Sequence, residues 1–252
     1  MIEMIHGMMT LVAVACLPVA VYGQAAATAP AAPITTKQIA AMQQKLDDWP
    51  QLARYRDANA ALPPVATGEK RVVFYGDSIT DAWAMKPDEF FPGKHYIGRG
   101  ISGQTTPQML VRFQQDVVRL KPAVVVILAG TNDIAGNTGP ETPEMIEDNF
   151  ESMVAIAKSN NIRTVISSIL PTDHFNWKPE AQPAEQVRQM NAWLKALCQR
   201  EGLVYLDYYT AMTNAKGGLD PELAKDGVHP TSKGYAMMSP LAEKAIAEAL
   251  AR

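Results

Sequence analysis

Ser78 lies where an apolar segment meets a polar turn, within residues 71–80. Residues 72–75 are β-branched or aromatic and end at Gly76, which is typical of a buried strand. Ser78 then follows the carboxyl end of that strand, where open α/β sheets bind their ligands. The carboxylate of Asp77 can accept hydrogen bonds from backbone N–H groups and hold the turn. Ser78 is therefore a candidate nucleophile, although a plain strand-to-helix turn with Ser78 as N-cap would have the same sequence.

Later polar segments follow other predicted elements. Gly103 lies in a glycine-rich turn, residues 98–105, which can aim backbone N–H groups at an anion. Asn132, within residues 130–133, could point its side-chain amide into the same crevice. Each segment alone could be a turn without chemistry. Because both follow predicted strands, at the edge where a parallel sheet has its ligand site, together they indicate a catalytic site.

Asp226 and His229 are three residues apart, just before the last predicted helix. Ester cleavage by serine needs a base, a group that fixes the tautomer of that base, and donors for the oxyanion. On one turn, Asp226 could accept from Nδ1–H of His229 and leave Nε2 facing Ser78. With Gly103 and Asn132 as oxyanion donors, each of these roles has a candidate residue.

Four blocks resemble, in order and approximate spacing, those of the SGNH hydrolases, the GDSL family of esterases and lipases: Gly76-Asp77-Ser78-Ile79, Gly103, Gly130-Thr131-Asn132-Asp133 and Asp226-x-x-His229. The resemblance spans about residues 71–252. Position 80 is Thr, so the Gly-x-Ser-x-Gly elbow of ordinary α/β-hydrolases is absent.

The resemblance implies a role for each residue of the predicted site. The implied roles are Ser78 as nucleophile and backbone oxyanion donor, Gly103 and Asn132 as further oxyanion donors, His229 as base and Asp226 as its orienting acid. We assign supporting roles to Asp77 and Asp133. The predicted function is hydrolysis of short-chain acyl esters, acetyl esters of carbohydrates in particular, through a covalent acyl-enzyme. An acyltransferase with the same triad and a noncatalytic carbohydrate-binding protein on the same fold are the alternatives.

Strand and helix patterns alternate along the chain and predict right-handed crossovers that build a parallel sheet. The predicted strands are residues 71–75, 95–97, 123–129, 163–170 and 203–206. The main predicted helices are residues 106–120, 143–159, 184–200 and 231–251. We therefore expect a three-layer α/β/α sandwich with a five-stranded parallel sheet in flavodoxin-like order.

Four segments are predicted along the chain: a signal peptide over residues 1–23, an Ala/Pro-rich linker over 24–33, a helical lead-in packed on the main domain over 34–66, and an SGNH-type hydrolase domain over 67–252. The apolar residues 8–22 are fewer than the ~20 that a membrane-spanning helix needs. They predict export to the periplasm or medium, with cleavage near Gly23. The alternative is a lipoprotein acylated at Cys16.

Composition describes an ordinary globular protein, with 47% hydrophobic and 19% charged residues. The net charge is -3 and the basic residues are scattered, so nucleic acid is not an expected partner. Cys198 has the helical spacing of a core thiol, and no Cys/His cluster has structural-zinc spacing. We expect no metal, no cofactor and no stable membrane span, and leave the oligomeric state open.

Aromatic residues near the expected site edge could contact a sugar ring or acyl chain, or instead pack in the core: Trp83, Phe175, Trp177, Tyr208 and Tyr209. The long connection 171–183 could form one wall of the site. It contains His174, a competing base that we rank behind His229 because we find no acid at matching spacing.

Overall fold

The computed structural model of the chain describes residues 34–252. The predicted signal peptide, the linker, Gly23 and Cys16 lie outside the described residues. Contacts divide the chain after Ala40, within helix α1 (Thr36–Asp47). The sheet and the other helices belong to the larger unit, Ala41–Arg252.

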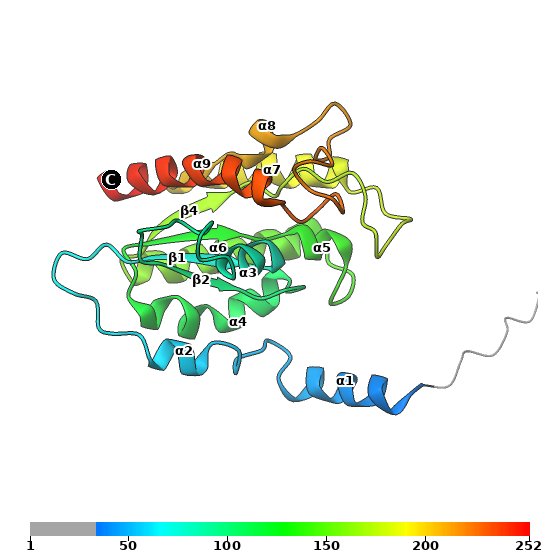
Figure 1. Cartoon of the computed structure of the whole chain (residues 1–252), viewed down its shortest axis with the longest axis horizontal. Helices are drawn as coiled ribbons and strands as arrows, with labels where there is room; N and C mark the ends of the chain where they lie inside the picture. The colour runs from blue at the N-terminus through cyan, green and yellow to red at the C-terminus, as the bar shows by residue number, and fades with distance from the viewer. Residues whose placement is uncertain (1–33) are drawn as a thin grey trace, which may run out of the picture. The chain divides into compact units, whose positions relative to one another are not determined.

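Five parallel strands form one sheet in the order β2-β1-β3-β4-β5 (Figure 1). The strands are β1 (Val72–Gly76), β2 (Tyr96–Gly100), β3 (Val124–Leu128), β4 (Arg163–Ser167) and β5 (Val204–Leu206). Every residue of β1 and β3 is buried, as expected for strands covered on both faces. The predicted flavodoxin-like sandwich is therefore confirmed.

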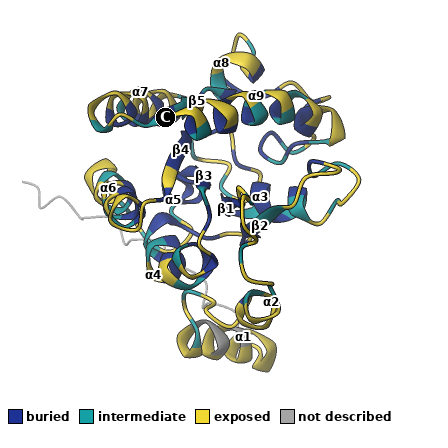
Figure 2. Cartoon of the chain, turned by 90° about the vertical axis from the view of Figure 1, so that its left-hand side faces the viewer, coloured by how far each residue is buried: buried dark blue, intermediate teal, exposed yellow. Residues whose placement is uncertain are grey.

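Helices cover both faces of the sheet (Figure 2). One face packs against α3 (Ser78–Ala84), α8 (Tyr208–Met212) and α9 (Ser232–Ala251). The other packs against α4 (Thr106–Asp116), α6 (Pro143–Ser159) and α7 (Ala184–Glu201). Because successive strand side chains point to opposite faces, Phe74 joins the first core and Tyr75 the second. The remaining elements are α2 (Arg56–Ala60), the 3₁₀ turn η1 (Val118–Leu120) and α5 (Thr131–Ala135).

Strand β2 is longer than predicted and extends to Gly100. Gly98 and Gly100, predicted to lie in a glycine-rich turn, are strand residues on which α3 packs. A Cβ at Gly100 would lie 2.1 Å from the backbone N of Asp81, and one at Gly98 would lie 2.2 Å from Cβ of Ala84. These glycines therefore permit close helix packing, and the turn itself is only residues 101–105.

The lead-in contains α1 and α2, and apolar side chains of α1 are exposed. Met42 and Leu46 are 55% and 78% exposed. Attachment comes instead from the segment after α1. Three glutamine side chains donate hydrogen bonds of 2.7–2.8 Å to backbone carbonyls of this segment. Gln104 donates to Pro50 O, Gln108 to Trp49 O and Gln115 to Leu52 O. The proposed boundaries 34–66 and 67–252 stay predictions.

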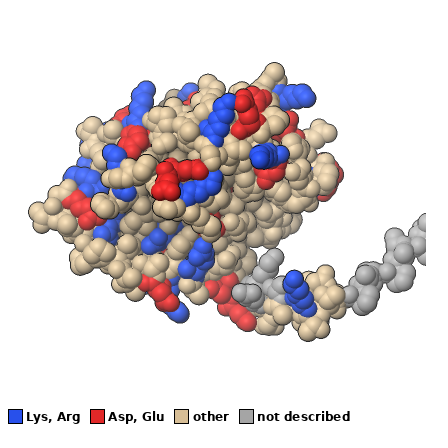
Figure 3. All heavy atoms as spheres, in the orientation of Figure 1, with Lys and Arg blue, Asp and Glu red and all other residues tan. Residues whose placement is uncertain are grey.

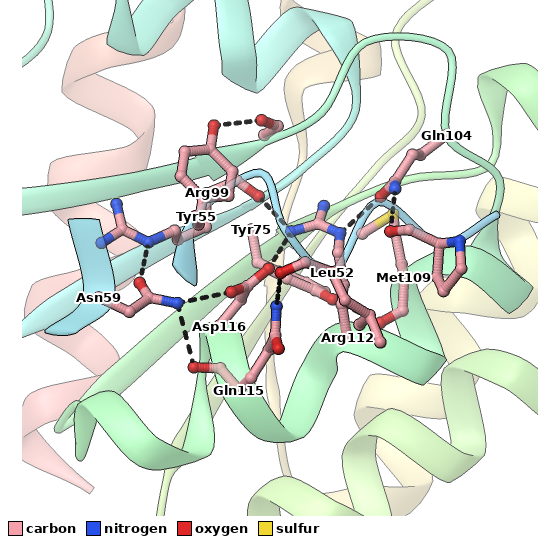
Figure 4. Close-up of polar contacts among 12 residues, drawn as sticks. Leu52, Tyr55, Asn59, Tyr75, Arg99, Gln104, Met109, Arg112, Gln115 and Asp116 are labelled. Atoms are coloured by element: carbon pink, nitrogen blue, oxygen red, sulfur yellow. Dashed lines mark hydrogen bonds and ion pairs between the residues drawn. The ribbon is translucent and has the colours of Figure 1, made fainter. Parts of the chain in front are cut away.

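A buried guanidinium ties the ends of β1 and β2 to α4 (Figure 4). Arg112 donates to Gly76 O at 2.8 Å and to Arg99 O at 2.9 Å. It also donates to Gln104 Oε1 at 2.5 Å and pairs with Asp116 Oδ2 at 3.2 Å. Both charged side chains are fully buried, so each depends on the other for its partner.

Acidic and basic side chains are interspersed on the face shown in Figure 3. Across residues 34–252, no helix has the length and apolar character needed to cross a membrane. Within that same part of the chain, no cluster of three or more His, Cys, Asp or Glu residues could hold a metal ion. Cys198 is buried in the core as predicted, and burial raises the pKa of its thiol to about 12.

Replacing Arg112 with Met should lower the free energy of unfolding by about 3–5 kcal/mol, because Asp116 would keep a buried charge without its cation. Urea unfolding measures the loss. The exposed Arg119→Ala on the same segment is the control and should change stability by less than about 0.5 kcal/mol. Equal small losses in both variants would show that Arg112 does not hold the strand ends together.

Candidate active site

Ser78 is the first residue of α3, directly after β1. Asp77 is the N-cap, because its Oδ1 accepts from Ile79 N at 3.0 Å. The alternative with Ser78 as N-cap is therefore wrong, and Asp77 holds the turn as predicted. Since the cap is supplied by its neighbour, the Ser78 hydroxyl is available for another partner.

A chain of hydrogen bonds links Ser78, His229 and Asp226. Ser78 Oγ lies 2.8 Å from His229 Nε2, and His229 Nδ1 lies 2.6 Å from Asp226 Oδ2. An ionised Asp226 can only accept, so Nδ1 carries the proton and Nε2 presents its lone pair to the Ser78 O–H. This is the geometry of a serine whose proton can pass to a histidine base.

The carboxylate of Asp226 is held by its own turn. Its Oδ1 accepts from the backbone N–H of Val228 at 3.0 Å and of His229 at 2.8 Å. Burial acts to raise the pKa of Asp226, but the bonds from the His229 backbone and ring and from the Val228 N–H outweigh it and lower the pKa. Asp226 therefore stays ionised and fixes the orientation of the imidazole.

Gly103 lies at the bend between β2 and α4 with a positive φ of 79°. A Cβ built there would meet nothing within 4 Å, so this backbone borders open space. The preceding Ser102 donates from its N and its Oγ to Asp81 Oδ2, at 3.3 and 2.9 Å. Asp81 on α3 thus fixes the bend beside the helix that begins at Ser78.

The Asn132 amide is oriented by a relay of side chains. The Trp177 indole, which can only donate, gives its N–H to Asn137 Oδ1 at 3.1 Å. The Asn137 amide must then donate to Asn132 Oδ1, at 2.7 Å. This turns Nδ2 of Asn132 toward Gln104 O at 3.0 Å and Asp77 Oδ2 at 3.3 Å. Sequence reasoning missed Asn137 and the relay, because no local pattern connects such distant positions.

Two buried carboxyls stand near the site. Burial raises the pKa of Asp77 to about 6, against the opposing bond from Ile79 N–H and the nearby His229. Burial, together with the adjacent Glu141, raises the pKa of Asp133 to about 8. Asp133 Oδ1 accepts from the N and Oγ1 of Thr106 at 2.8 and 2.5 Å, which anchors the start of α4.

Asp133 and Glu141 form a carboxyl pair. Each has one buried oxygen, Oδ2 and Oε2, that no donor within residues 34–252 reaches. The neighbouring Glu141, together with burial, raises the pKa of Asp133 and so favours its protonated form. Through its bonds from Thr106, Asp133 ties α5 to the start of α4.

Most of the aromatic residues predicted at the site edge are core residues instead. Trp83, Phe175 and Tyr208 are buried, because Trp83 packs among the rings of the first core and Phe175 packs against Val228. Trp177 remains 46% exposed. Of the two alternatives that the sequence leaves open, packing in the core therefore holds for these three residues.

The connection 171–183 abuts the turn that carries Asp226. Thr172 Oγ1 donates to Gly227 O at 3.0 Å, and Asn176 Nδ2 donates to Asp226 O at 3.2 Å. His174 Nδ1 lies 2.7 Å from Oδ1 of Asp173, which is the adjacent residue and not an acid at the spacing of Asp226 and His229. The histidine that is hydrogen-bonded to Ser78 is nevertheless His229.

A hollow of about 910 Å³ borders the bend at Gly103. Its walls come from the lead-in, the bend after β2 and the loop after α5, and include Trp49, Gln51, Arg54, Ser102, Gly103 and Thr138. Sequence reasoning did not place the lead-in beside the site, because those residues fall outside the four blocks.

Residues 74–237 match the GDSL-like Lipase/Acylhydrolase family. A protein of Bacteroides fragilis NCTC 9343 with a known crystal structure is 46% identical in sequence to this chain, with a TM-score of 0.78. The alignment covers 81% of this chain and 99% of that one. The crystal structure of a GDSL-like lipase from Bacteroides thetaiotaomicron VPI-5482 is 42% identical, with a TM-score of 0.77, and covers 80% and 99%. An acetylxylan esterase of Geobacillus stearothermophilus is 25% identical over 69% of this chain and 92% of its own length.

The raised pKa of Asp133 predicts a stability that falls with pH. An acid whose pKa is higher in the folded state stabilises the fold fully below its unfolded value, near 4, and this contribution is lost as pH rises to about 8. Asp133→Asn mimics the protonated acid, so the stability of the wild type should fall relative to the variant over that range. The slope is at most about 1.4 kcal/mol per pH unit.

Urea unfolding at pH 4, 6 and 8 measures this difference. The exposed Asp148→Asn is the control and should follow the wild type at each pH. Parallel stability curves for wild type and Asp133→Asn would contradict the raised pKa of Asp133.

Proposed function

We propose that this chain, which belongs to the GDSL-like lipase/acylhydrolase family and is a carboxylic ester hydrolase, cleaves short-chain acyl esters through a triad of Ser78, His229 and Asp226. The observation that carries the proposal is the 2.8 Å contact between Ser78 Oγ and His229 Nε2, in a histidine whose other nitrogen is bound by Asp226. The noncatalytic binding protein is set aside because the chain is an ester hydrolase.

Ser78 Oγ attacks the ester carbonyl while its proton passes to Nε2 of His229. The tetrahedral oxyanion forms near the N–H groups of Ser78 and Gly103 and the amide of Asn132. Collapse expels the alcohol, which takes the proton from Nε2, and leaves Ser78 acylated. Water then attacks the acyl-enzyme by the same route, giving the acid and restoring the serine. Asp226 stabilises the imidazolium that forms in each half of the cycle.

The Asn132 amide has the hydrogen-bond capacity for this role. One N–H is well bound by Gln104 O at 3.0 Å, whereas the contact to Asp77 Oδ2 is longer, at 3.3 Å. The second N–H is therefore the one that can turn to a developing oxyanion. Charge on that oxygen strengthens the bond beyond what Asp77 offers in the resting site.

Acetyl esters of carbohydrates are the proposed substrates. A relative that matches over 92% of its length is an acetylxylan esterase, which supports this choice at 25% identity. Export fits an enzyme whose substrate is an extracellular glycan, and we propose that residues 1–23 direct it, with acylation at Cys16 as the alternative. Transfer of the acyl group to a sugar hydroxyl instead of water would use the same residues. Added acceptor alcohol distinguishes the two outcomes.

Ser78→Ala should lower kcat for p-nitrophenyl acetate by more than about 10⁴-fold, because the nucleophile is removed. Release of p-nitrophenol measures it. Ser159→Ala removes an exposed hydroxyl at the end of α6 and should leave kcat unchanged. Turnover by a folded Ser78→Ala protein at the rate of the control would exclude the proposed nucleophile.

Asn132→Ala should lower kcat by roughly 10²–10³-fold, since it removes one donor to the oxyanion. KM should change little, because the bond strengthens only in the transition state. Asn160→Ala, at the exposed C-cap of α6, is the matched control. Thermal unfolding of both variants confirms that they fold, and an unaltered kcat in folded Asn132→Ala would remove this residue from the oxyanion hole.

A further inference from the structure

We propose that the hollow beside Gly103 binds a sugar ring of the substrate and that Trp49 is its stacking surface and a specificity-determining residue. This inference rests on the proposed function, since it assigns the alcohol half of the ester to the hollow. We call this space the lead-in hollow; its walls include Trp49, Gln51, Arg54, Ser102, Gly103 and Thr138.

The lead-in hollow is much larger than an acetyl group requires. At about 910 Å³ it lies at the upper end of the range of sites that enclose whole small molecules. It adjoins the backbone of Gly103, a proposed oxyanion donor, where no atom would obstruct even a Cβ. A group bonded to the scissile carbonyl can therefore extend into it. Its size fits the alcohol half of a carbohydrate ester better than a short acyl chain.

The wall that carries Trp49 is held by many interactions. Gln108 donates to Trp49 O at 2.7 Å, and Gln104 donates to Pro50 O at 2.8 Å. Asp48 accepts from the N–H groups of Leu52 and Ala53 at 2.8 and 3.0 Å.

This wall also contains a strained residue. Gln51 has a positive φ of 55°, which is unfavourable for a side chain of its size. The hydrogen bonds from Gln104 and Gln108 on either side hold the wall in this conformation.

Trp49 itself is available to a ligand. The bond from Gln108 uses its backbone carbonyl, and the residue is 42% exposed at the edge of the hollow. An aromatic face contacts the C–H face of a sugar ring, while nearby donors and acceptors bind its hydroxyls.

Polar groups complete the site. The guanidinium of Arg54 lies 3.4 Å from Asp81 and over the Tyr55 ring, and 42% of its side chain is exposed, so it can still offer an N–H donor to a ligand. Ser102 Oγ donates to Asp81 and can still accept a hydrogen bond. A wall with one aromatic face and several hydrogen-bonding groups suits a polyhydroxylated ring and not an alkyl chain.

The test compares two substrates of the full chain, partially acetylated xylo-oligosaccharides and ethyl acetate, both followed by acetate release. Trp49→Ala should lower kcat/KM for the oligosaccharide about tenfold, mainly through KM, because stacking is equal in ground and transition states. Its kcat/KM for ethyl acetate, whose alcohol half has no ring to stack, should change less than about twofold. Trp49→Phe keeps an aromatic face and should retain kcat/KM for the oligosaccharide within about threefold.

The control is Val111→Ala, a half-exposed apolar residue on α4 outside the walls of the hollow, which should leave both substrates unaffected. An equal loss on both substrates, or no loss on the oligosaccharide, overturns the inference while leaving the triad intact. A loss that instead grows from p-nitrophenyl acetate to butyrate to octanoate assigns the hollow to the acyl chain and likewise overturns it.

Binding separates this inference from the proposed catalysis. In the Ser78→Ala protein, calorimetry should detect binding of the acetylated oligosaccharide. Adding Trp49→Ala should raise the Kd about tenfold. The inference is overturned if the oligosaccharide does not bind, or if Trp49→Ala leaves the Kd unchanged. This holds whether or not the wild type hydrolyses the substrates. A wild type that hydrolyses neither substrate contradicts the proposed function, and the calorimetric result still decides the role of Trp49.

Discussion

The buried guanidinium of Arg112 is the interaction on which the rest of the architecture depends. It draws together carbonyl oxygens at the ends of two adjacent strands, Gly76 and Arg99, and binds the side chain of Gln104. Ser78 follows one strand end, and Gln104 is bound by Asn132 and binds the lead-in. A buried cation thus fixes the relative positions of Ser78, Asn132 and the lead-in wall.

Three carboxyls around the site differ because their surroundings differ. Asp226 is partly exposed and receives N–H donors from its own turn, so it remains charged beside His229. Asp77 and Asp133 are buried, and burial raises their pKa to about 6 and about 8. Of the three, Asp226 therefore stays ionised to the lowest pH, whereas Asp77 and Asp133 accept hydrogen bonds from backbone N–H groups and hold the turns.

The sequence predicts the sheet well because strands buried on both faces are uninterrupted apolar runs, as in residues 124–128. It predicts β2 poorly because Gly98 and Gly100 resemble a turn, and only the packed α3 explains them. The resemblance supplied Ser78 and His229, which the structure brings together. It could not supply the relay through Asn137 or the exposed stripe of α1, because both depend on tertiary contacts.

The glutamines that hold the lead-in bind only main-chain oxygens, which every amino acid carries. Attachment of this segment is therefore independent of the side chains at positions 49 and 52. Side chains at these two positions can therefore change without loss of the glutamine bonds. The rim of the hollow can vary in sequence, whereas the attachment through Tyr55 and Asn59 cannot, because it uses their side chains.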